Sequence, residues 1–99
     1  MASGLRFEWD PKKNAVNMRR HKVSFDEAAS AFLDENGLLI ADPDHSDGED
    51  RFVLLGLSST LRLLLVCHCY KTDDGLIRII SARKADRQER ETYTRRIRS

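Results

Sequence analysis

Ile77-Arg78-Ile79-Ile80-Ser81-Ala82-Arg83-Lys84-Ala85 is the stretch of sequence that decides the fold. Its β-branched apolar residues favour a strand that is packed on both faces. Residues 86–89 then match a capping box, which predicts a helix directly after the strand. Arg83 and Lys84 therefore lie between the strand end and the helix start, and Arg78 interrupts the apolar residues of the strand. This arrangement suits phosphate binding, because the strand fixes the side chains and the helix start offers free N–H groups.

The residues before this stretch predict two helices and a run of strands. Alternation of apolar and polar residues over 5–9 predicts a half-buried strand. Asp10-Pro11 then begins a helix that runs to about residue 20, with Asp10 as its cap. Ser24-Phe25-Asp26-Glu27 is a capping box that opens a second helix, with Phe25, Ala28, Ala29 and Phe32 on its apolar side. Further strands are predicted at 38–40, 51–57, 62–70 and 76–81, with a hairpin turn at 73–75 and a final helix at 87–96.

This order of elements predicts a single α+β domain over residues 1–99. A sheet this short needs a covered face to be stable, so we expect the two early helices to pack on one face. The sheet is expected to be twisted, antiparallel and built from four or five strands. The final helix is expected beside the strand 76–81.

Composition excludes several classes of protein. Hydrophobic residues make up 40% and charged residues 33% of the chain, which is typical of a globular protein and not of a disordered one. No apolar run approaches the roughly 20 residues of a membrane helix, and no signal peptide is visible. With only two cysteines, the chain is predicted to be cytoplasmic and to have no membrane partner.

Charge is distributed unevenly along the chain. Residues 1–30 carry a net charge of +2, residues 31–70 carry −5 and residues 71–99 carry +4. Such a molecule can hold a basic face for an anionic partner. The same charges are also compatible with a role in solubility alone.

Two segments resemble metal sites, and their spacing argues against both. The acidic loop 42–50 places Gly48 one position late for an EF-hand, and Val53 stands where the bidentate glutamate belongs. Cys67 and Cys69 point to one face of a strand and His68 to the other, so the three cannot bind one metal. We therefore predict free thiols and no metal.

Several single residues have both a structural and a functional interpretation. His68 is either a general base or a core residue, and its apolar strand favours the core. Trp9 is either a core aromatic or a surface on which a base stacks. The arginines of the predicted final helix have i,i+4 ion pairs that explain them, whereas Arg78, Arg83 and Lys71 lie outside that helix, although Lys71 is close to two aspartates. These three residues are therefore the candidates for binding phosphate.

The chain resembles the BrnT family, the toxin halves of bacterial type II toxin–antitoxin pairs. The matching residues are Phe7-Glu8-Trp9-Asp10, Lys13, Asn14, His21-Lys22-Val23-Ser24-Phe25-Asp26-Glu27-Ala28, Arg51, Arg78-Ile79-Ile80-Ser81-Ala82-Arg83-Lys84-Ala85, Glu89 and Tyr93. The resemblance implies a RelE-like fold, a ribonuclease toxin that inhibits translation, and a BrnA-type antitoxin. DNA would be bound only through that antitoxin. One departure is Lys71, where the family usually has arginine. Lysine keeps the charge but lacks the bidentate fork.

The resemblance and the cationic residues together define an expected site. RNA supplies its own nucleophile, the 2′-hydroxyl, so cations and a proton acceptor suffice and no cofactor is expected. The expected catalytic residues are Lys71, Arg78 and Arg83, with His68 and Tyr93 as candidates for proton transfer. The expected RNA-binding residues are Trp9, Lys13, Arg51 and Lys84. The competing interpretation is a non-catalytic RNA- or protein-binding module.

Overall fold

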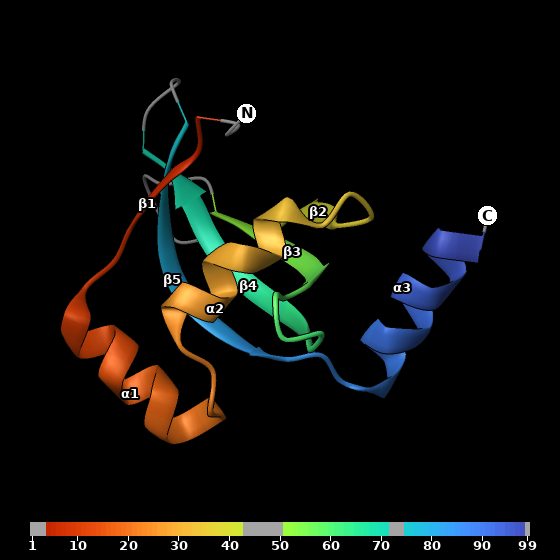
Figure 1. Cartoon of the computed structure of the whole chain (residues 1–99), viewed down its shortest axis with the longest axis horizontal. Helices are drawn as coiled ribbons and strands as arrows, with labels where there is room; N and C mark the ends of the chain where they lie inside the picture. Colours follow the sequence, from red (N-terminus) through yellow and green to blue (C-terminus); the bar gives the residue numbers. More distant parts are fainter. Residues whose placement is uncertain (1–3, 43–50, 72–74, 99) are drawn as a thin grey trace.

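The computed structural model describes residues 4–42, 51–71 and 75–98. The elements, in chain order, are β1 (Arg6–Glu8), α1 (Pro11–His21), α2 (Phe25–Ser30), the 3-10 helix η1 (Ala31–Leu33), β2 (Leu38–Ala41), β3 (Arg51–Leu57), β4 (Leu63–Tyr70), β5 (Leu76–Lys84) and α3 (Arg87–Arg98) (Figure 1). Most of the predicted acidic loop and of the predicted hairpin turn, residues 43–50 and 72–74, lies outside the described residues. None of the described helices has the length and apolarity that a bilayer crossing requires.

The strands form one five-stranded sheet in the order β1-β5-β4-β3-β2. The predicted α+β class is confirmed, but the sheet is mixed and not wholly antiparallel. Strand β1 pairs with β5 in parallel, with Phe7 opposite Ile77, while the other pairs are antiparallel. Periodicity did not reveal this pair, because a pairing between residues 70 positions apart leaves no local signal.

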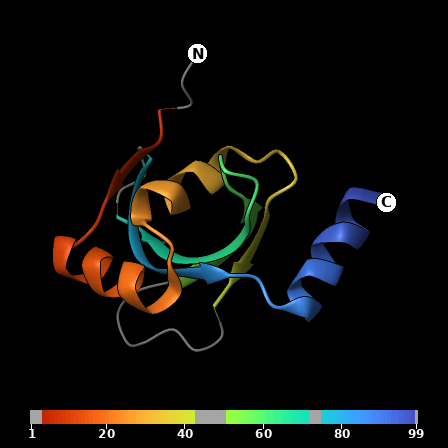
Figure 2. The same ribbon diagram turned by 60° about the horizontal axis from the view of Figure 1, so that its bottom comes forward.

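The sheet curves around α2 and η1, which lie on its concave face (Figure 2). The core on this face consists of Val23, Phe25, Ala28, Ala31, Leu54, Leu64, Val66, Ile79 and Ala82. Gly56 allows η1 to approach the sheet, since a Cβ at this position would lie 2.9 Å from the carbonyl oxygen of Ala31. The predicted cover of one face by the early helices is thus confirmed for α2.

Helix α3 does not lie beside the segment 76–81, where it was expected. Strand β5 continues to Lys84, three residues further than predicted, so the helix begins beyond that segment. Its Tyr93 packs with Leu55 and Ala85 in a second apolar cluster, and its hydroxyl donates to Asp34 Oδ2 at 2.6 Å. A buried tyrosine hydroxyl needs such a partner, and the partner here comes from the loop after η1.

A β-bulge in β5 determines which face its arginines occupy. The register with β4 pairs Ile79 with His68 and Ser81 with Cys67, and it skips Ile80. Arg78 and Arg83 are five residues apart, so in a regular strand they would point to opposite faces. One extra residue reverses the alternation. Both arginines therefore belong to the convex face, opposite the face that α2 covers.

Asn17 holds α1 against the edge of β5. Its side-chain Nδ2 donates to the carbonyl oxygens of Val23 and Ala82 at 2.9 and 2.8 Å, and its Oδ1 accepts from the Ala82 N–H at 3.1 Å. The side chain is buried, so these bonds satisfy groups that water cannot reach. They fix the distance between α1 and the bulged part of β5.

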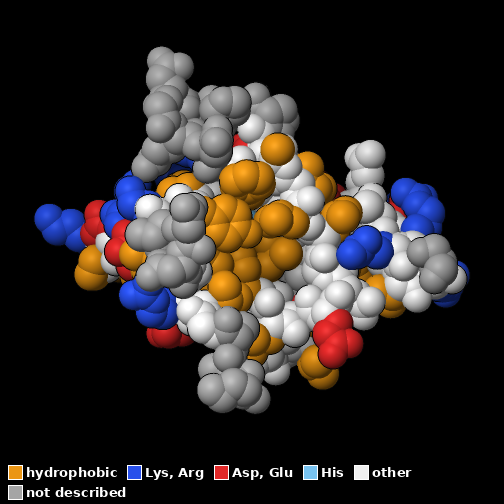
Figure 3. All heavy atoms as spheres, turned by 90° about the horizontal axis from the view of Figure 1, so that it is seen from above, with side chains coloured by type: hydrophobic (Ala, Val, Ile, Leu, Met, Phe, Trp, Pro, Cys, Tyr) orange, Lys and Arg blue, Asp and Glu red, His pale blue; other side chains and the backbone are white. Residues whose placement is uncertain are grey.

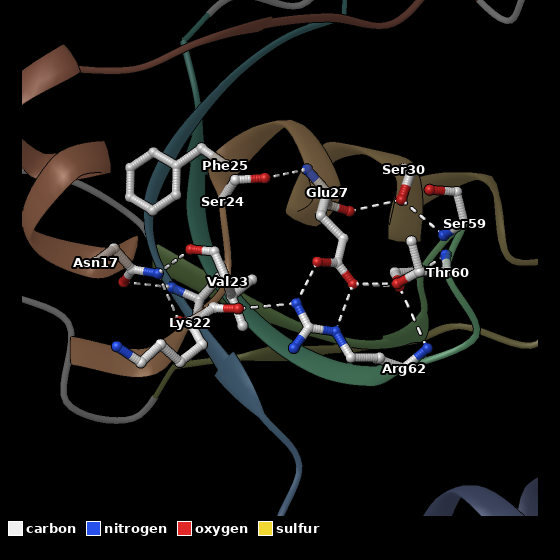
Figure 4. Close-up of polar contacts among 12 residues, drawn as sticks. Asn17, Lys22, Val23, Ser24, Phe25, Glu27, Ser30, Ser59, Thr60 and Arg62 are labelled. Atoms are coloured by element: carbon white, nitrogen blue, oxygen red, sulfur yellow. Dashed lines mark hydrogen bonds and ion pairs between the residues drawn. The ribbon is translucent and has the colours of Figure 1, made fainter. Parts of the chain in front are cut away.

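A polar cluster joins α2 to the turn between β3 and β4 (Figure 4). Ser24 Oγ accepts from the Glu27 N–H at 3.1 Å, as the capping box predicted. The Glu27 carboxylate, however, turns toward Arg62, which donates to it through Nε at 2.9 Å and through Nη2. Ser58 and Thr60 donate to the same carboxylate at 2.7 and 2.6 Å. The cluster therefore replaces the second half of the capping box with a link to the sheet.

Candidate active site

Four residues form one row across the convex face of the sheet. Arg51 pairs with Cys69, Cys69 with Arg78, and Arg78 with Glu8, so the row crosses β3, β4, β5 and β1. Adjacent strands lie about 4.8 Å apart, which places the Cα atoms of Arg51 and Arg78 roughly 10 Å from each other. Arg78 Nη1 donates to Glu8 Oε2 at 2.9 Å. The row thus joins two guanidinium groups and a carboxylate.

Solvent reaches this ion pair. The side chains of Arg78 and Glu8 are 37% and 38% exposed, so an anion from solution can approach both groups. Nε of Arg51 is buried and has no hydrogen-bond partner among the described residues. Lys71 is exposed, and its N–H donates to the Leu76 carbonyl oxygen at 2.9 Å, two positions beyond Cys69. The structure therefore brings the predicted Lys71, Arg51 and Arg78 into one region.

Arg83 lies further along the same face. Its register partner Leu65 is four residues from Cys69, the partner of Arg78, which separates the two arginines by roughly 13 Å along the strand. Arg83 binds Glu89 bidentately, at 2.9 and 2.8 Å. The hydrogen bond to Glu89 raises the pKa of Arg83 and lowers the pKa of Glu89. Arg78 and Arg83 therefore bind different carboxylates, which argues against our expectation that both grip one phosphate.

His68 is fully buried, which supports its interpretation as a core residue. Its ring packs edge-on against Phe32 and Tyr70, with centroids 4.7 and 5.4 Å away, and is inclined by 30° to the ring of Phe52 at 6.2 Å. Its Nδ1 lies 3.1 Å from the Val66 carbonyl oxygen, and its buried Nε2 has no partner among the described residues. Burial lowers the pKa of His68. The ring is shielded from solvent, so we no longer assign it a part in proton transfer.

The face of the sheet that carries His68 and Tyr70 is unsuited to a polyanion, because it is largely hydrophobic. Figure 3 shows hydrophobic side chains gathered at the end of the molecule that is uppermost in Figure 1, with Lys and Arg near the margins. Tyr70, beside His68, is 44% exposed, and Leu33 of η1 is 74% exposed. A phosphate backbone is therefore expected on the convex face of the sheet and not on the face that carries these hydrophobic side chains.

Tyr93 and Trp9 also have structural roles. The buried Tyr93 belongs to the cluster with Leu57 and Leu63, at the opposite end of β3 from Arg51. Burial and the hydrogen bond to Asp34 raise the pKa of Tyr93 to about 12. Trp9 is half-buried and packs edge-on against Phe25, with the ring centroids 6.1 Å apart. We therefore remove both residues from the proposed site.

Sequence reasoning missed Glu8. Its position in the alternating segment 5–9 predicted only a polar strand residue, and its ion pair with Arg78 joins residues 70 positions apart. A carboxylate beside a guanidinium can accept a proton while the guanidinium neutralises developing charge.

The remaining residues that were predicted to bind RNA, Lys13 and Lys84, are exposed. Cys67 and Cys69 are free thiols, as predicted.

The chain is thus a small α+β domain whose convex face carries a partly exposed row of two arginines and a carboxylate. The family model described as the ribonuclease toxin, BrnT, of type II toxin–antitoxin systems matches residues 9–89. The chain therefore belongs to the BrnT family, and the predicted resemblance is confirmed.

A solved structure has a similar fold. The crystal structure of the Brucella abortus ribonuclease toxin BrnT superposes with a TM-score of 0.62 at 19% sequence identity, covering 84% of this chain and 99% of that chain. At this identity the likeness shows the fold alone. A comparison with curated proteins found no match.

Proposed function

We propose that this chain cleaves RNA without a metal ion, by attack of the 2′-hydroxyl on the adjacent phosphorus. The observation that carries the proposal is the partly exposed row of Arg51, Arg78 and Glu8, with the exposed Lys71 beside it. The proposed toxin acts in the cytoplasm and inhibits translation by destroying RNA. Among the described residues, no group of three or more His, Cys, Asp or Glu side chains is arranged to hold a metal ion.

The proposed reaction uses each group of the row once. The Glu8 carboxylate takes the proton from the 2′-hydroxyl, and the 2′-oxygen forms a new bond to phosphorus. Arg78 and Arg51 neutralise the charge that develops on the phosphate oxygens, since guanidinium matches them bidentately. The bond from phosphorus to the 5′-oxygen breaks, and that oxygen takes a proton from water or from Lys71. The products are a 2′,3′-cyclic phosphate and a 5′-hydroxyl.

The experiment is incubation of the purified protein with cellular RNA, with and without EDTA. We expect equal cleavage in both samples, and product ends that carry a 2′,3′-cyclic phosphate. Cleavage that EDTA abolishes, or products with 3′-hydroxyl ends, would contradict the proposed chemistry.

A non-catalytic RNA- or protein-binding module is the second candidate. The observation that favours it is that Arg78 and Arg83 already have carboxylate partners, Glu8 and Glu89, which suits a purely structural role. In that case the same incubation gives retarded but intact RNA. Binding without cleavage would establish this alternative.

We further propose that a BrnA-type antitoxin neutralises the toxin by covering the basic face built from residues 71–99. This segment has a net charge of +4, which favours an acidic partner surface and rapid association. We expect the affinity, measured by calorimetry, to fall as NaCl rises from 50 to 500 mM. An affinity that does not change with salt would contradict an electrostatic interface.

A further inference from the structure

A groove of about 280 Å³ lies between α1 and the bulged part of β5. Its apolar floor is formed by Val16 of α1 and Ile80 of β5. Lys12, Lys13 and Arg20 of α1 line it as well. Val16 is 43% exposed, so the floor is open to a ligand. No acidic residue of the described chain lines the groove, which therefore suits a ligand that carries both negative charge and a flat apolar part.

The cations of the groove differ from the arginines of the convex face. No ion pair joins Lys12, Lys13 or Arg20 to a described residue, whereas Arg78 and Arg83 each have a carboxylate partner. An anion can bind these three groups without displacing a carboxylate. Phosphate binding in the groove therefore meets less competition from carboxylates than at Arg78 or Arg83.

The groove is also rigid and close to the proposed site. Asn17 bonds to Ala82 and fixes α1 against β5, so the two walls keep their spacing. Ile80 is the residue that the register with β4 skips, and it lies two positions from Arg78, roughly 7 Å along the strand. A strand of RNA with one phosphate at Arg78 would reach the groove within the next nucleotide.

We propose that this groove binds one unpaired nucleotide of the RNA that flanks the cleaved bond. The base lies on Val16 and Ile80 and stacks on the ring of His21, which also lines the groove, while the flanking phosphates bind Lys13 and Arg20. Single-stranded RNA is recognised in this way, through apolar or ring contacts to the base and cations along the backbone. The inference rests on the proposed function, because it makes RNA the ligand.

The test uses a single-stranded 2′-O-methyl oligonucleotide, which the proposed reaction cannot cleave, and measures its affinity by fluorescence anisotropy at several salt concentrations. The double variant Lys13→Ala, Arg20→Ala is expected to bind about tenfold more weakly at 50 mM salt, and its salt slope to fall by about 1.4, since each lost phosphate contact to a single strand removes about 0.7. The matched control is Arg95→Ala, Arg98→Ala on α3, which removes two charges outside the groove and is expected to bind like the wild type.

Val16→Asn tests the contact with the base. We expect it to weaken binding several-fold and to leave the salt slope unchanged, because no cation is lost. An abasic strand should bind to the wild type and to Val16→Asn equally weakly, whereas a strand with bases should distinguish them. Equal affinity of both strands for the wild type would refute the contact with the base.

The outcomes separate this inference from the proposed function. Groove-dependent binding in a protein that leaves RNA intact would support the groove and contradict the ribonuclease. Cleavage of RNA together with unchanged oligonucleotide affinity in the groove variants would overturn the groove. If these variants bind RNA normally but lose the antitoxin, the groove serves a protein partner and the inference is wrong.

Discussion

Replacing Arg78 with alanine is expected to lower the rate of RNA cleavage by about 10²–10³-fold while the protein stays folded and still binds its antitoxin. The reason is that Arg78 stands at the centre of the convex row and is the guanidinium positioned to neutralise charge on the scissile phosphate. Cleavage of a fluorescent RNA substrate measures the rate, and circular dichroism checks the fold. Growth arrest on expression should disappear in parallel.

The variant Glu8→Gln tests whether the Glu8 carboxylate acts as a general base or only positions Arg78. Glutamine keeps an oxygen that can accept from Arg78, so a positioning role alone predicts a small loss. A general base predicts a loss of about 10²–10⁴-fold and a change in the acidic limb of the pH–rate profile. An unchanged profile in Glu8→Gln would show that the carboxylate only orients Arg78.

Two further variants complete the comparison. Arg87→Ala on α3 is the control, because Arg87 is 90% exposed and its contact with Glu91 is 3.7 Å long. It should keep the full rate. Lys71→Arg restores the residue that the family usually carries and should leave the rate equal or raise it. Full activity in a folded Arg78→Ala protein would end the proposed assignment.

Local sequence patterns predicted the elements of this fold well. Strand β3 has the bounds that periodicity predicted, and the caps at Asp10 and Ser24 accept from the N–H groups of Lys12 and Glu27. The box between Asp86 and Glu89 is formed in both directions, at 2.8 and 2.9 Å. These features depend on residues within one helical turn or on alternation within one strand. A short segment of sequence therefore contains all the residues that determine each of these features.

Features that depend on distant partners were not predictable in this way. The parallel pairing of β1 and the position of α3 depend on contacts such as Tyr93 to Asp34, which are 59 residues apart. The residues of the candidate site were likewise predicted only where a local pattern marks them. Arg78 was found because it interrupts an apolar strand, whereas Glu8 was missed because its partner is in another strand. The bulge at Ile80, which places Arg83 on the same face as Arg78, has no glycine or other local marker.

Acid is expected to destabilise this protein in large part through Glu27. Hydrogen bonds from Arg62, Thr60 and Ser58 lower the pKa of Glu27 from 4.5 to about 2, although its burial acts in the opposite direction. The folded state therefore holds this proton less tightly than the unfolded state. The stabilisation is fully present above the unfolded pKa of about 4.5 and is lost as the pH falls toward 2. At neutral pH it amounts to about 3 kcal/mol, since one pKa unit is about 1.4 kcal/mol.

The measurement is urea unfolding of the wild type and of Glu27→Gln at pH 7, 5 and 3. Asp34 and Glu89 also have lowered pKa values, so the wild-type curve contains their contributions as well. The difference between the two proteins isolates Glu27. It should be largest at pH 7 and should shrink by most of its value at pH 3. The exposed Glu35→Gln is the matched control and should give a small difference.

Arg62→Gln tests the same cluster from the cationic side. It leaves a carboxylate that is only 12% exposed without its guanidinium, and the Lys22 carbonyl oxygen without its donor. We expect a loss of about 2–4 kcal/mol at pH 7, because the largely buried Glu27 carboxylate would keep its charge without its partner, which costs more than removing both groups. The double variant Glu27→Gln, Arg62→Gln should then lose less than the sum of the two single losses. Strict additivity at pH 7 would mean that the two side chains act independently and that the pKa of Glu27 has another cause.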